Sequence, residues 1–219
     1  MIEFRAPKPE NVLLEAITLP GQVVRYHLIA EFLRMRKRVF VDEKAWPLFY
    51  ADGLEFEQYD TFDTTYILAH DGKKVFGGAR LRRTDMRAGA GSIAYSYMIR
   101  DAFLGLLPNM PKNLCYSEPP MDSQTWELTR LVATGGPNIV EQVLVAANEY
   151  IYQAGGSRCL FLGSPAFLRM AKRLGWEPAP LGDVVGNNDG RFVAFGCGIR
   201  KPITGPKAPI SNTVSVFTG

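Results

Sequence analysis

The chain has 219 residues, with 25 lysines and arginines, 22 aspartates and glutamates and only two histidines, which gives a formal charge of +3. A chain of this length can bury about two-thirds of its unfolded surface, so its core needs neither disulfides nor metals. The weak charge argues against a dedicated nucleic-acid binder. His27 and His70 leave little for a His-rich metal site or a Ser-His-Asp triad, so several large enzyme classes are excluded.

The cysteines and the N-terminal residues bear on the cellular compartment. Three cysteines lie far apart without a CxxC spacing, which fits neither a zinc ribbon nor a disulfide framework. A sparse, odd count is typical of reduced thiols in the cytosol. Residues 1–10 interleave charges with prolines where a secretory signal needs an apolar run, and no stretch approaches a membrane span. We expect a cytoplasmic protein with no metal, no membrane partner and no nucleic-acid partner.

An amphipathic helix is expected over residues 23–40, because apolar side chains recur there at spacings of three and four. These side chains are Val24, Leu28, Phe32, Met35 and Val39. Arg36 falls on or beside this apolar stripe, so its charge must be paired or must reach water at the edge of the stripe. Residues 41–62 follow as a long connection rich in aromatic and acidic side chains, which usually marks function or disorder.

The middle of the chain predicts a hairpin, a helix and a strand. Segments 65–70 and 74–82 flank Asp71-Gly72, a dipeptide that is the strongest short-range hairpin signal. A helix is expected over residues 93–107. A strand is expected over residues 125–133, because apolar and polar side chains alternate there.

The last third is expected to alternate helices and strands. Asn138, with Glu141 three residues later, resembles a capping arrangement for a helix that runs to about residue 153. A strand, a helix opened by Ser164-Pro165 and a final strand follow, over residues 158–162, 165–174 and 191–199. This order implies a mixed sheet covered by helices, an α/β/α sandwich in one domain over residues 1–200. The Pro-rich tail, 201–219, carries little pattern, and we expect disorder there.

Three carboxylates gather in the long connection. If the chain is extended there, Glu55 and Glu57 project to the same side, and Asp60 follows just before the hairpin. Carboxylates beside Trp and Tyr rings suit a cationic, partly aromatic ligand, because ring faces also attract positive charge. The alternative is a solvated acidic loop.

Three arginines stand among apolar neighbours, where an arginine is usually ion-paired. These are Arg36, Arg80 and Arg130, and the available partners are the acidic connection and Glu127. Such a network can be merely architectural. Three arginines that converge on one acidic segment would instead form a pre-organised polar pocket.

The strand over residues 125–133 is expected to present Glu127, Thr129 and Leu131 on one side, with Leu128 and Arg130 on the other. Glu127 could accept a proton or hold an amine, although a glutamate in a strand can also be structural.

A second cluster is basic and lies on the helix over residues 165–174, where Arg169, Lys172 and Arg173 are near neighbours. They could recognise a phosphate or an acidic protein, and a solvated basic face is the alternative. Neither a P-loop nor a GxGxxG fingerprint occurs.

Five separated segments together resemble the acyl-homoserine-lactone synthases, the LuxI-type autoinducer synthases. The segments are RKRVF at 36–40, Trp46, EFEQYD at 55–60, RLRRT at 80–84 and ELTR at 127–130. The resemblance extends over about residues 25–176 and includes MIRDAFLGLL at 98–107. Several matches in the right order are far more specific than any single motif.

The resemblance implies a fold similar to the GNAT acyltransferases and a reaction between S-adenosylmethionine and an acyl thioester on acyl carrier protein or coenzyme A. The methionine amine is acylated first. The carboxylate then closes the lactone and expels methylthioadenosine. Adenosylmethionine and the acyl thioester are substrates, so no prosthetic group and no metal are expected.

The resemblance also assigns roles to single residues. The positions that match the family's adenosylmethionine pocket and its polar network are Arg36, Phe40, Trp46, Glu57, Asp60, Arg80 and Arg130, with Phe103 matching an aromatic that shapes the pocket. Glu127 matches the strand glutamate linked to deprotonation of the amine through water. Thr129 and Arg130 follow it in the same catalytic segment, and backbone N–H groups near Leu131 could hold the oxyanion.

Departures from the family pattern bear on the acyl group. Family members commonly carry Asp at the position of Glu57 and Ser at that of Thr129. A threonine common in enzymes for 3-oxo acyl chains is missing, and Phe161 stands near its place. With Leu131 and Phe161 in the acyl pocket, we expect a short, branched or aryl acyl group. Arg169, Lys172 and Arg173 would suit either an acidic carrier protein or coenzyme A phosphates.

Two other functions compete with this one. A GNAT N-acyltransferase that uses acyl-CoA and another amine should carry a glycine-rich pyrophosphate loop, and residues 134–137 are a poor version because Pro137 lacks a donor N–H. A non-catalytic sensor should have lost the base or the pocket arginines, whereas Glu127, Arg36 and Arg130 are all present.

Overall fold

The computed structural model describes residues 12–90, 93–107, 110–134, 136–187 and 190–202. The predicted disorder of the tail concerns residues that, from 203 on, lie outside this described part.

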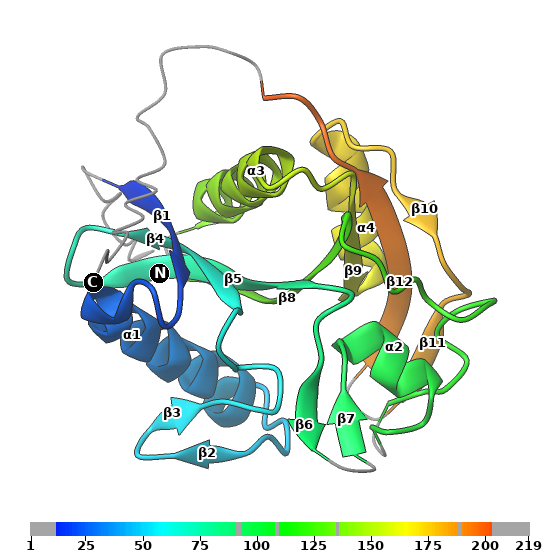
Figure 1. The fold of residues 1–219 in the computed structure, drawn as a ribbon, viewed down its shortest axis with the longest axis horizontal. Coiled ribbons are helices and arrows are strands. Elements are labelled where there is room, and N and C mark those ends of the chain that lie inside the picture. Colours follow the sequence, from blue (N-terminus) through cyan, green and yellow to red (C-terminus); the bar gives the residue numbers. More distant parts are fainter. Residues whose placement is uncertain (1–11, 91–92, 108–109, 135, 188–189, 203–219) are drawn as a thin grey trace, which may run out of the picture.

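A twisted mixed sheet of eight strands runs through the described part of the molecule (Figure 1). In spatial order its strands are β1 (Leu13–Thr18), β4 (Thr65–His70), β5 (Val75–Arg83), β8 (Thr125–Ala133), β9 (Arg158–Gly163), β12 (Gly190–Gly198) and β10 (Ala179–Pro180), with β11 (Val185–Asn187) also paired to β12. Two small hairpins lie outside it, β2–β3 (Tyr50–Ala51, Leu54–Glu55) and β6–β7 (Ala88–Ala90, Ile93–Tyr95).

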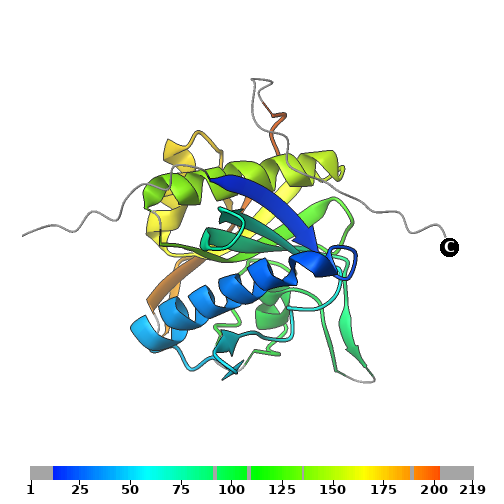
Figure 2. The ribbon, with the colours of Figure 1, turned by 90° about the vertical axis from the view of Figure 1, so that its left-hand side faces the viewer.

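Helices cover both faces of the sheet, and α1 (Tyr26–Arg36) and α3 (Pro137–Gln153) lie on opposite faces (Figures 1 and 2). The core between α1 and the sheet includes Phe32, Tyr66 and Val132. The core on the other face includes Leu128 and the inner side of α3. There α4 (Pro165–Arg173) packs on β9 and β12, while α2 (Met98–Phe103) shares a cluster with the opposite face of these strands. The predicted α/β/α sandwich is confirmed.

The central pair of strands, β8 and β9, is parallel, whereas the other neighbours in the sheet are antiparallel. Its pairing runs from Thr125 opposite Arg158 to Leu128 opposite Phe161 and stops there. Beyond Leu128 the two strands no longer pair, so the second half of β8 has a free backbone edge next to the residues predicted to be catalytic.

Local signals predicted five of the eight sheet strands, β4, β5, β8, β9 and β12, and the helices α1, α3 and α4. The strand over residues 125–133 is confirmed as β8, and the hairpin around Asp71-Gly72 is confirmed as β4–β5. Ser164 caps α4, because its hydroxyl accepts a hydrogen bond from the Phe167 N–H. At α3, however, the expected cap at Asn138 is wrong: Gly136 is the N-cap and Pro137 is the first helical residue, where its missing N–H does no harm.

Three element predictions need correction. The helix expected over 23–40 is α1 between a 3₁₀ turn, η1 (Val23–Arg25), and a π-helical turn, η2 (Lys37–Glu43), and Val24 is 82% exposed instead of packed. The helix expected over 93–107 is shortened to α2, because β7 pairs with β6. The connection over 41–62 contains the β2–β3 hairpin. Strand β1, which pairs with β4 over its whole length, has no counterpart in the predicted elements.

A β-bulge interrupts β8 and changes which side chains face the site. The register with β5 moves from Arg80 opposite Thr129 to Gly78 opposite Val132, so two β8 residues stand opposite Ala79. Arg130 takes the left-handed conformation there, with φ of 54°. The expected alternation of side chains therefore fails. Thr129 bonds to Arg80 and Arg130 bonds to Glu57 on the α1 face, while Leu131 packs on the α3 face.

The tight packing of α1 on the sheet predicts a cost for one added methyl group. At Gly78 a Cβ would stand 3.0 Å from Phe32 Cε2 of α1, and 2.6 Å from Leu68 Cδ2 and 2.8 Å from the Ile67 carbonyl oxygen of β4. We expect Gly78→Ala to lower the free energy of unfolding by about 1–3 kcal/mol in urea denaturation. Gly198→Ala, where nothing lies within 4 Å, is the control. Equal stability of the two variants would contradict the close approach of α1.

Candidate active site

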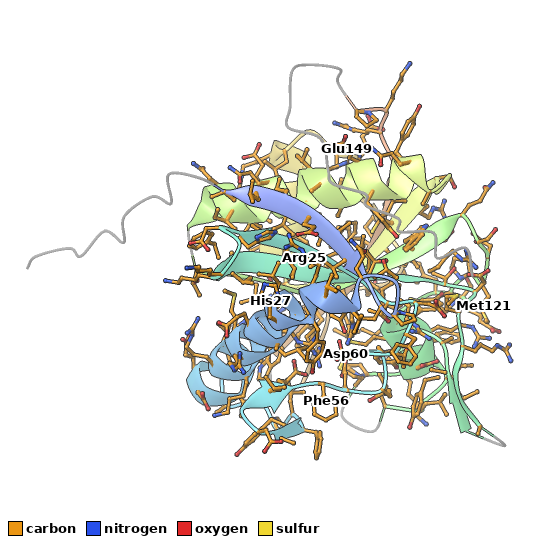
Figure 3. All side chains as sticks on the ribbon, turned by 60° about the vertical axis from the view of Figure 1, so that its left-hand side comes forward. Arg25, His27, Phe56, Asp60, Met121 and Glu149 are labelled. Atoms are coloured by element: carbon orange, nitrogen blue, oxygen red, sulfur yellow. The ribbon has the colours of Figure 1, made fainter. Side chains whose placement is uncertain are left out.

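The site is built around Asp60, which lies on the α1 side of the sheet (Figure 3). Its carboxylate accepts two hydrogen bonds from Arg36, at 2.8 and 2.9 Å, and pairs with Arg80 Nη1 at 3.0 Å. The Tyr66 hydroxyl and the Glu57 backbone N–H also donate to it, each at 2.9 Å. One carboxylate thereby joins α1, β4, β5 and the connection before the hairpin.

Two glutamates complete the cluster. Glu55 accepts a hydrogen bond from Arg36 Nε at 2.5 Å and pairs with Arg130 Nη2 at 3.2 Å. Glu57 accepts from Arg80 at 2.6 Å and from Arg130 at 2.8 Å. Both carboxylates therefore meet the same Arg130 guanidinium, as expected for an extended chain at 55–57.

The cluster is buried and its charges balance. Arg36 and Glu55 are fully buried, and three arginines face three carboxylates. Burial alone would raise the pKa of Asp60, but Arg80 and Arg36 outweigh it and hold that pKa well below its usual range. Burial likewise opposes ionisation of Glu57, whose pKa is nevertheless lowered by Arg130 and Arg80. The solvated acidic loop is therefore wrong, and the arginines converge as a pre-organised pocket requires.

Aromatic rings form one wall of the site. Phe40 and Trp46 stack with ring centroids 5.2 Å apart and an interplanar angle of 6°. The Arg130 guanidinium lies over Phe40 at 5.7 Å, and Lys44 Nζ lies over Trp46 at 4.9 Å. The π-helical turn η2 carries Phe40, and the backbone N–H of Trp46 donates to the backbone carbonyl of Phe40. The local backbone structure therefore holds the two rings next to each other.

Glu127 is a fully buried carboxylate near this cluster. It accepts hydrogen bonds from the backbone N–H groups of Met98, at 3.0 Å, and Ile99, at 2.8 Å. Burial raises its pKa to about 7, although these two N–H groups and the charge of Arg80 act in the opposite direction. A carboxylate with a pKa near neutrality can both accept and release a proton at physiological pH.

The remaining predicted site residues fall into four places. Thr129 lies in the cluster, where its hydroxyl accepts from Arg80 Nε at 3.1 Å. Phe103 is half-buried against the α2 cluster. Leu131 and Phe161 pack on the opposite face of the sheet, with α3. The side chains of Arg169, Lys172 and Arg173 are exposed on α4, apart from the buried cluster.

Some residues of the site carry no local sequence signal. Glu55 was recognisable as one of three carboxylates, but its place between two arginines depends on the fold. Arg82, Ser96 and Asp101 are buried next to Glu127's hydrogen-bond donors, and only contacts between distant segments bring them there.

The fold and the site define a class of α/β sandwich proteins with a buried arginine–carboxylate cluster on one face of the sheet. A Lactobacillus plantarum protein described as an N-acetyltransferase shares the fold, with a TM-score of 0.55 at 13% identity over 86% of this chain and 99% of that one. The GNAT-like fold predicted from the sequence is thereby confirmed.

More specific matches give the family. The autoinducer synthase family model matches residues 22–194. The acyl-homoserine-lactone synthase of Ralstonia solanacearum is 30% identical over 158 residues, 67% of this chain and 70% of that protein. TofI in a ternary complex with an inhibitor and MTA has a TM-score of 0.66 at 27% identity, over 86% of this chain and 91% of that one. The chain belongs to the autoinducer synthase family.

A second solved structure agrees in fold. BjaI, a CoA-dependent acyl-homoserine lactone synthase solved with SAM and isopentyl-CoA, has a TM-score of 0.72 at 22% identity, over 87% of this chain and 85% of that one.

None of the helices in the described ranges is long and apolar enough to cross a membrane.

The Asp60 hub predicts a strongly destabilised variant and an acid-dependent stability that this variant lacks. Asp60→Asn leaves two buried guanidinium groups short of a counter-charge, and we expect the free energy of unfolding to fall by about 3–5 kcal/mol. The pKa of Asp60 is lowered in the folded state, so its contribution is complete above its ordinary pKa, near 3.8, and is lost as pH falls below that value. Urea denaturation at several pH values measures both effects.

The matched control is Asp63→Asn, three residues further on, whose side chain is exposed. It should leave both the stability and its dependence on acid unchanged. An Asp60→Asn protein as stable as this control would contradict the role of Asp60 as the hub.

Proposed function

We propose that the chain synthesises an acyl-homoserine lactone from S-adenosylmethionine and an acyl thioester, in one catalytic domain over residues 1–200. The observation that carries this proposal is that a buried carboxylate, Glu127, lies close to the charge-balanced cluster. Both lie next to the half of β8 that does not pair with β9. Adenosylmethionine carries a sulfonium, an ammonium, a carboxylate and an adenine. Carboxylates, arginines and ring faces are the complementary groups.

The proposed pocket has an aromatic wall and a charged wall, and each binds different groups of adenosylmethionine. Phe40 and Trp46 offer ring faces to the sulfonium and adenine, and Glu57 and Asp60 offer negative charge to the cationic end. Arg80 pairs with Asp60 through Nη1 at 3.0 Å and with Glu57 through Nη2, so it fixes the two carboxylates that face the cationic end. The structure of TofI was solved with MTA, the nucleoside product of this reaction, which supports the assignment.

The first step is acyl transfer. The ammonium gives a proton to Glu127 through water, and the free amine attacks the thioester carbonyl carbon. The tetrahedral oxyanion forms next to β8, whose N–H groups near Leu131 supply the donors. Collapse breaks the carbon–sulfur bond, and the thiolate leaves with a proton from the amide nitrogen. In the second step a carboxylate oxygen attacks the carbon next to the sulfonium, which closes the lactone and releases methylthioadenosine.

The acyl pocket is proposed on the α3 and α4 side of the sheet, where Leu131 and Phe161 lie. The Phe161 ring stacks on Phe195 at 5.2 Å and meets Phe167 edge-on at 5.7 Å. The cavity beside it measures about 20 Å³, roughly the space of one water molecule. Aromatic rings thus occupy most of the space near Phe161, which supports a short, branched or aryl acyl group.

The acyl donor and the location complete the proposal. Arg169, Lys172 and Arg173 are exposed on α4, where they can meet the phosphates of coenzyme A or the acidic surface of a carrier protein. Cytoplasmic location is supported by the three cysteines, which are all free and buried.

The deciding experiment incubates the purified protein with adenosylmethionine and a panel of acyl-CoA and acyl-carrier-protein donors. Equimolar release of methylthioadenosine and an organic-soluble lactone is expected. Free thiol without methylthioadenosine would indicate ordinary N-acyl transfer, and neither product would indicate a sensor.

The base assignment predicts a selective loss of turnover. Glu127→Gln keeps the shape of the side chain but cannot accept the ammonium proton, so we expect kcat to fall about 10²–10⁴-fold. Adenosylmethionine affinity, measured by calorimetry, should stay within about threefold because the pocket arginines and carboxylates are unchanged. Glu177→Gln, at an exposed position, is the matched control. Unchanged turnover in Glu127→Gln would remove this residue from the mechanism.

The acyl-pocket assignment predicts a change of specificity. Phe161→Leu removes ring volume from the aromatic cluster, and we expect kcat/KM to rise about tenfold for longer straight-chain donors relative to short ones. Phe62→Leu, at a 67% exposed ring, serves as the control. An unaltered donor preference would show that Phe161 does not limit chain length.

A further inference from the structure

The two hydrogen-bond donors of Glu127 are themselves held in place by a buried structure. Both are backbone N–H groups, of Met98 and Ile99, and they directly follow Ser96 and Tyr97. A backbone donor can serve a carboxylate only while its segment keeps one conformation. Whatever fixes Ser96 therefore fixes the hydrogen bonds of Glu127.

Asp101 holds Ser96 from one side. Its carboxylate accepts a hydrogen bond from the Ser96 N–H at 2.9 Å and from the Ser96 hydroxyl at 2.7 Å. The Tyr59 hydroxyl donates to the same carboxylate at 2.8 Å and orients it. Asp101, Ser96 and Tyr59 are all at most 3% exposed, so water does not compete for these bonds.

Arg82 holds Ser96 from the other side. Its Nε donates to the Ser96 carbonyl oxygen at 2.6 Å, and its Nη1 donates to the hydroxyls of Thr61, at 2.8 Å, and Thr64, at 3.3 Å. Arg82 is 2% exposed and has no ion pair with a carboxylate among the described residues. Its strand position is directly opposite Glu127 across the β5–β8 pair.

Arg82 is buried and donates its hydrogen bonds to neutral oxygens. This needs an explanation, because burying a charge without a counter-charge lowers the stability of the fold. Burial lowers the pKa of Arg82, and the nearby negative groups, Glu127 among them, only partly offset this. A positioning role explains the arrangement, because one rigid guanidinium group joins β5 to the segment that donates hydrogen bonds to Glu127.

We propose that Arg82 and Asp101 form a buried clamp on Ser96 that positions the Met98 and Ile99 N–H groups on the carboxylate of Glu127. Both are positioning residues, because neither side chain hydrogen-bonds to Glu127. The inference rests on the proposed function only for the role of Glu127 as the base. The clamp itself is a claim about how a buried carboxylate is held.

The clamp has a measurable consequence, the proton affinity of Glu127. A carboxylate that loses N–H donors is less stable in its charged form, so its pKa rises. Other charged or titratable groups around it also act on that pKa. They are Arg80 and Arg82 on β5, Glu57 and Tyr59 in the connection before β4, Tyr97 before α2, and Cys159 on β9. Asp101 of α2 is a further charged group nearby, because it contacts Tyr59 and Ser96.

In Asp101→Asn, the direction in which the pKa of Glu127 moves distinguishes a positioning role from a purely electrostatic one. Removal of a nearby negative charge alone would lower the pKa of Glu127, whereas loss of the clamp would raise it. The measurement is an NMR titration of the full chain with ¹³C-labelled glutamate carboxyl groups, and Glu127→Gln identifies the signal. We expect a rise of roughly one pH unit in Asp101→Asn. A fall, or no change, would overturn the proposal.

Arg82→Lys makes the complementary test, because it keeps the positive charge but loses the fork that reaches Ser96 and the threonine hydroxyls together. We again expect the pKa of Glu127 to rise. Arg83→Lys, one residue further on at a half-exposed ion pair with Asp85, is the matched control and should change nothing. A pKa unchanged in Arg82→Lys would contradict the clamp.

Ser96→Ala covers the case in which the charged variants fail to fold. It removes the hydroxyl bond to Asp101 and leaves every charge in place, so a smaller rise of the pKa is expected and its absence counts against the proposal. No substrate is needed for these titrations, so they stand even if the proposed function fails. With turnover established, the acid limb of the kcat–pH profile should move upward by the same amount while KM for adenosylmethionine stays constant.

Discussion

The pairing of Asp60 with Arg36 and Arg80 is the interaction on which the rest of the structure depends. Arg36 lies on the buried side of α1, and without a partner its charge would prevent the helix from packing on the sheet. Asp60 provides that partner and binds Arg80 of β5 as well. The connection before the hairpin is thereby fixed against the sheet, and Glu55 and Glu57 are brought to Arg130.

Strand β8 links this pocket to the proposed chemistry. Its first half pairs with β9 and presents Glu127 in a buried setting, where the pKa rises to about 7. Its second half leaves β9 and carries the bulge that turns Arg130 toward the carboxylates. One strand thus supplies the proposed base, a pocket arginine and free N–H groups within a few residues, so neither histidine nor metal is needed for the proposed steps.

Sequence reasoning succeeded where the signal was local or where a family pattern was long. The alternation over residues 125–133 and the Asp71-Gly72 turn are both sufficient to define strands. Arg36 on an apolar stripe had to be paired, and it is. The bulge at Arg130 could not be predicted, because it depends on the register with β5. Ser96 and Asp101 were missed because Arg82 and Tyr59, which complete their hydrogen bonds, lie on distant segments.

The central claim is that a buried, charge-balanced cluster, and not an open acidic surface, receives the cationic substrate. Calorimetric titration of adenosylmethionine at salt concentrations from about 50 to 500 mM tests it directly, because salt screens exposed charges far more than buried ones. The cluster of three arginines and three carboxylates predicts a Kd that changes less than about threefold across this range. A Kd that weakens steeply with salt would contradict the account.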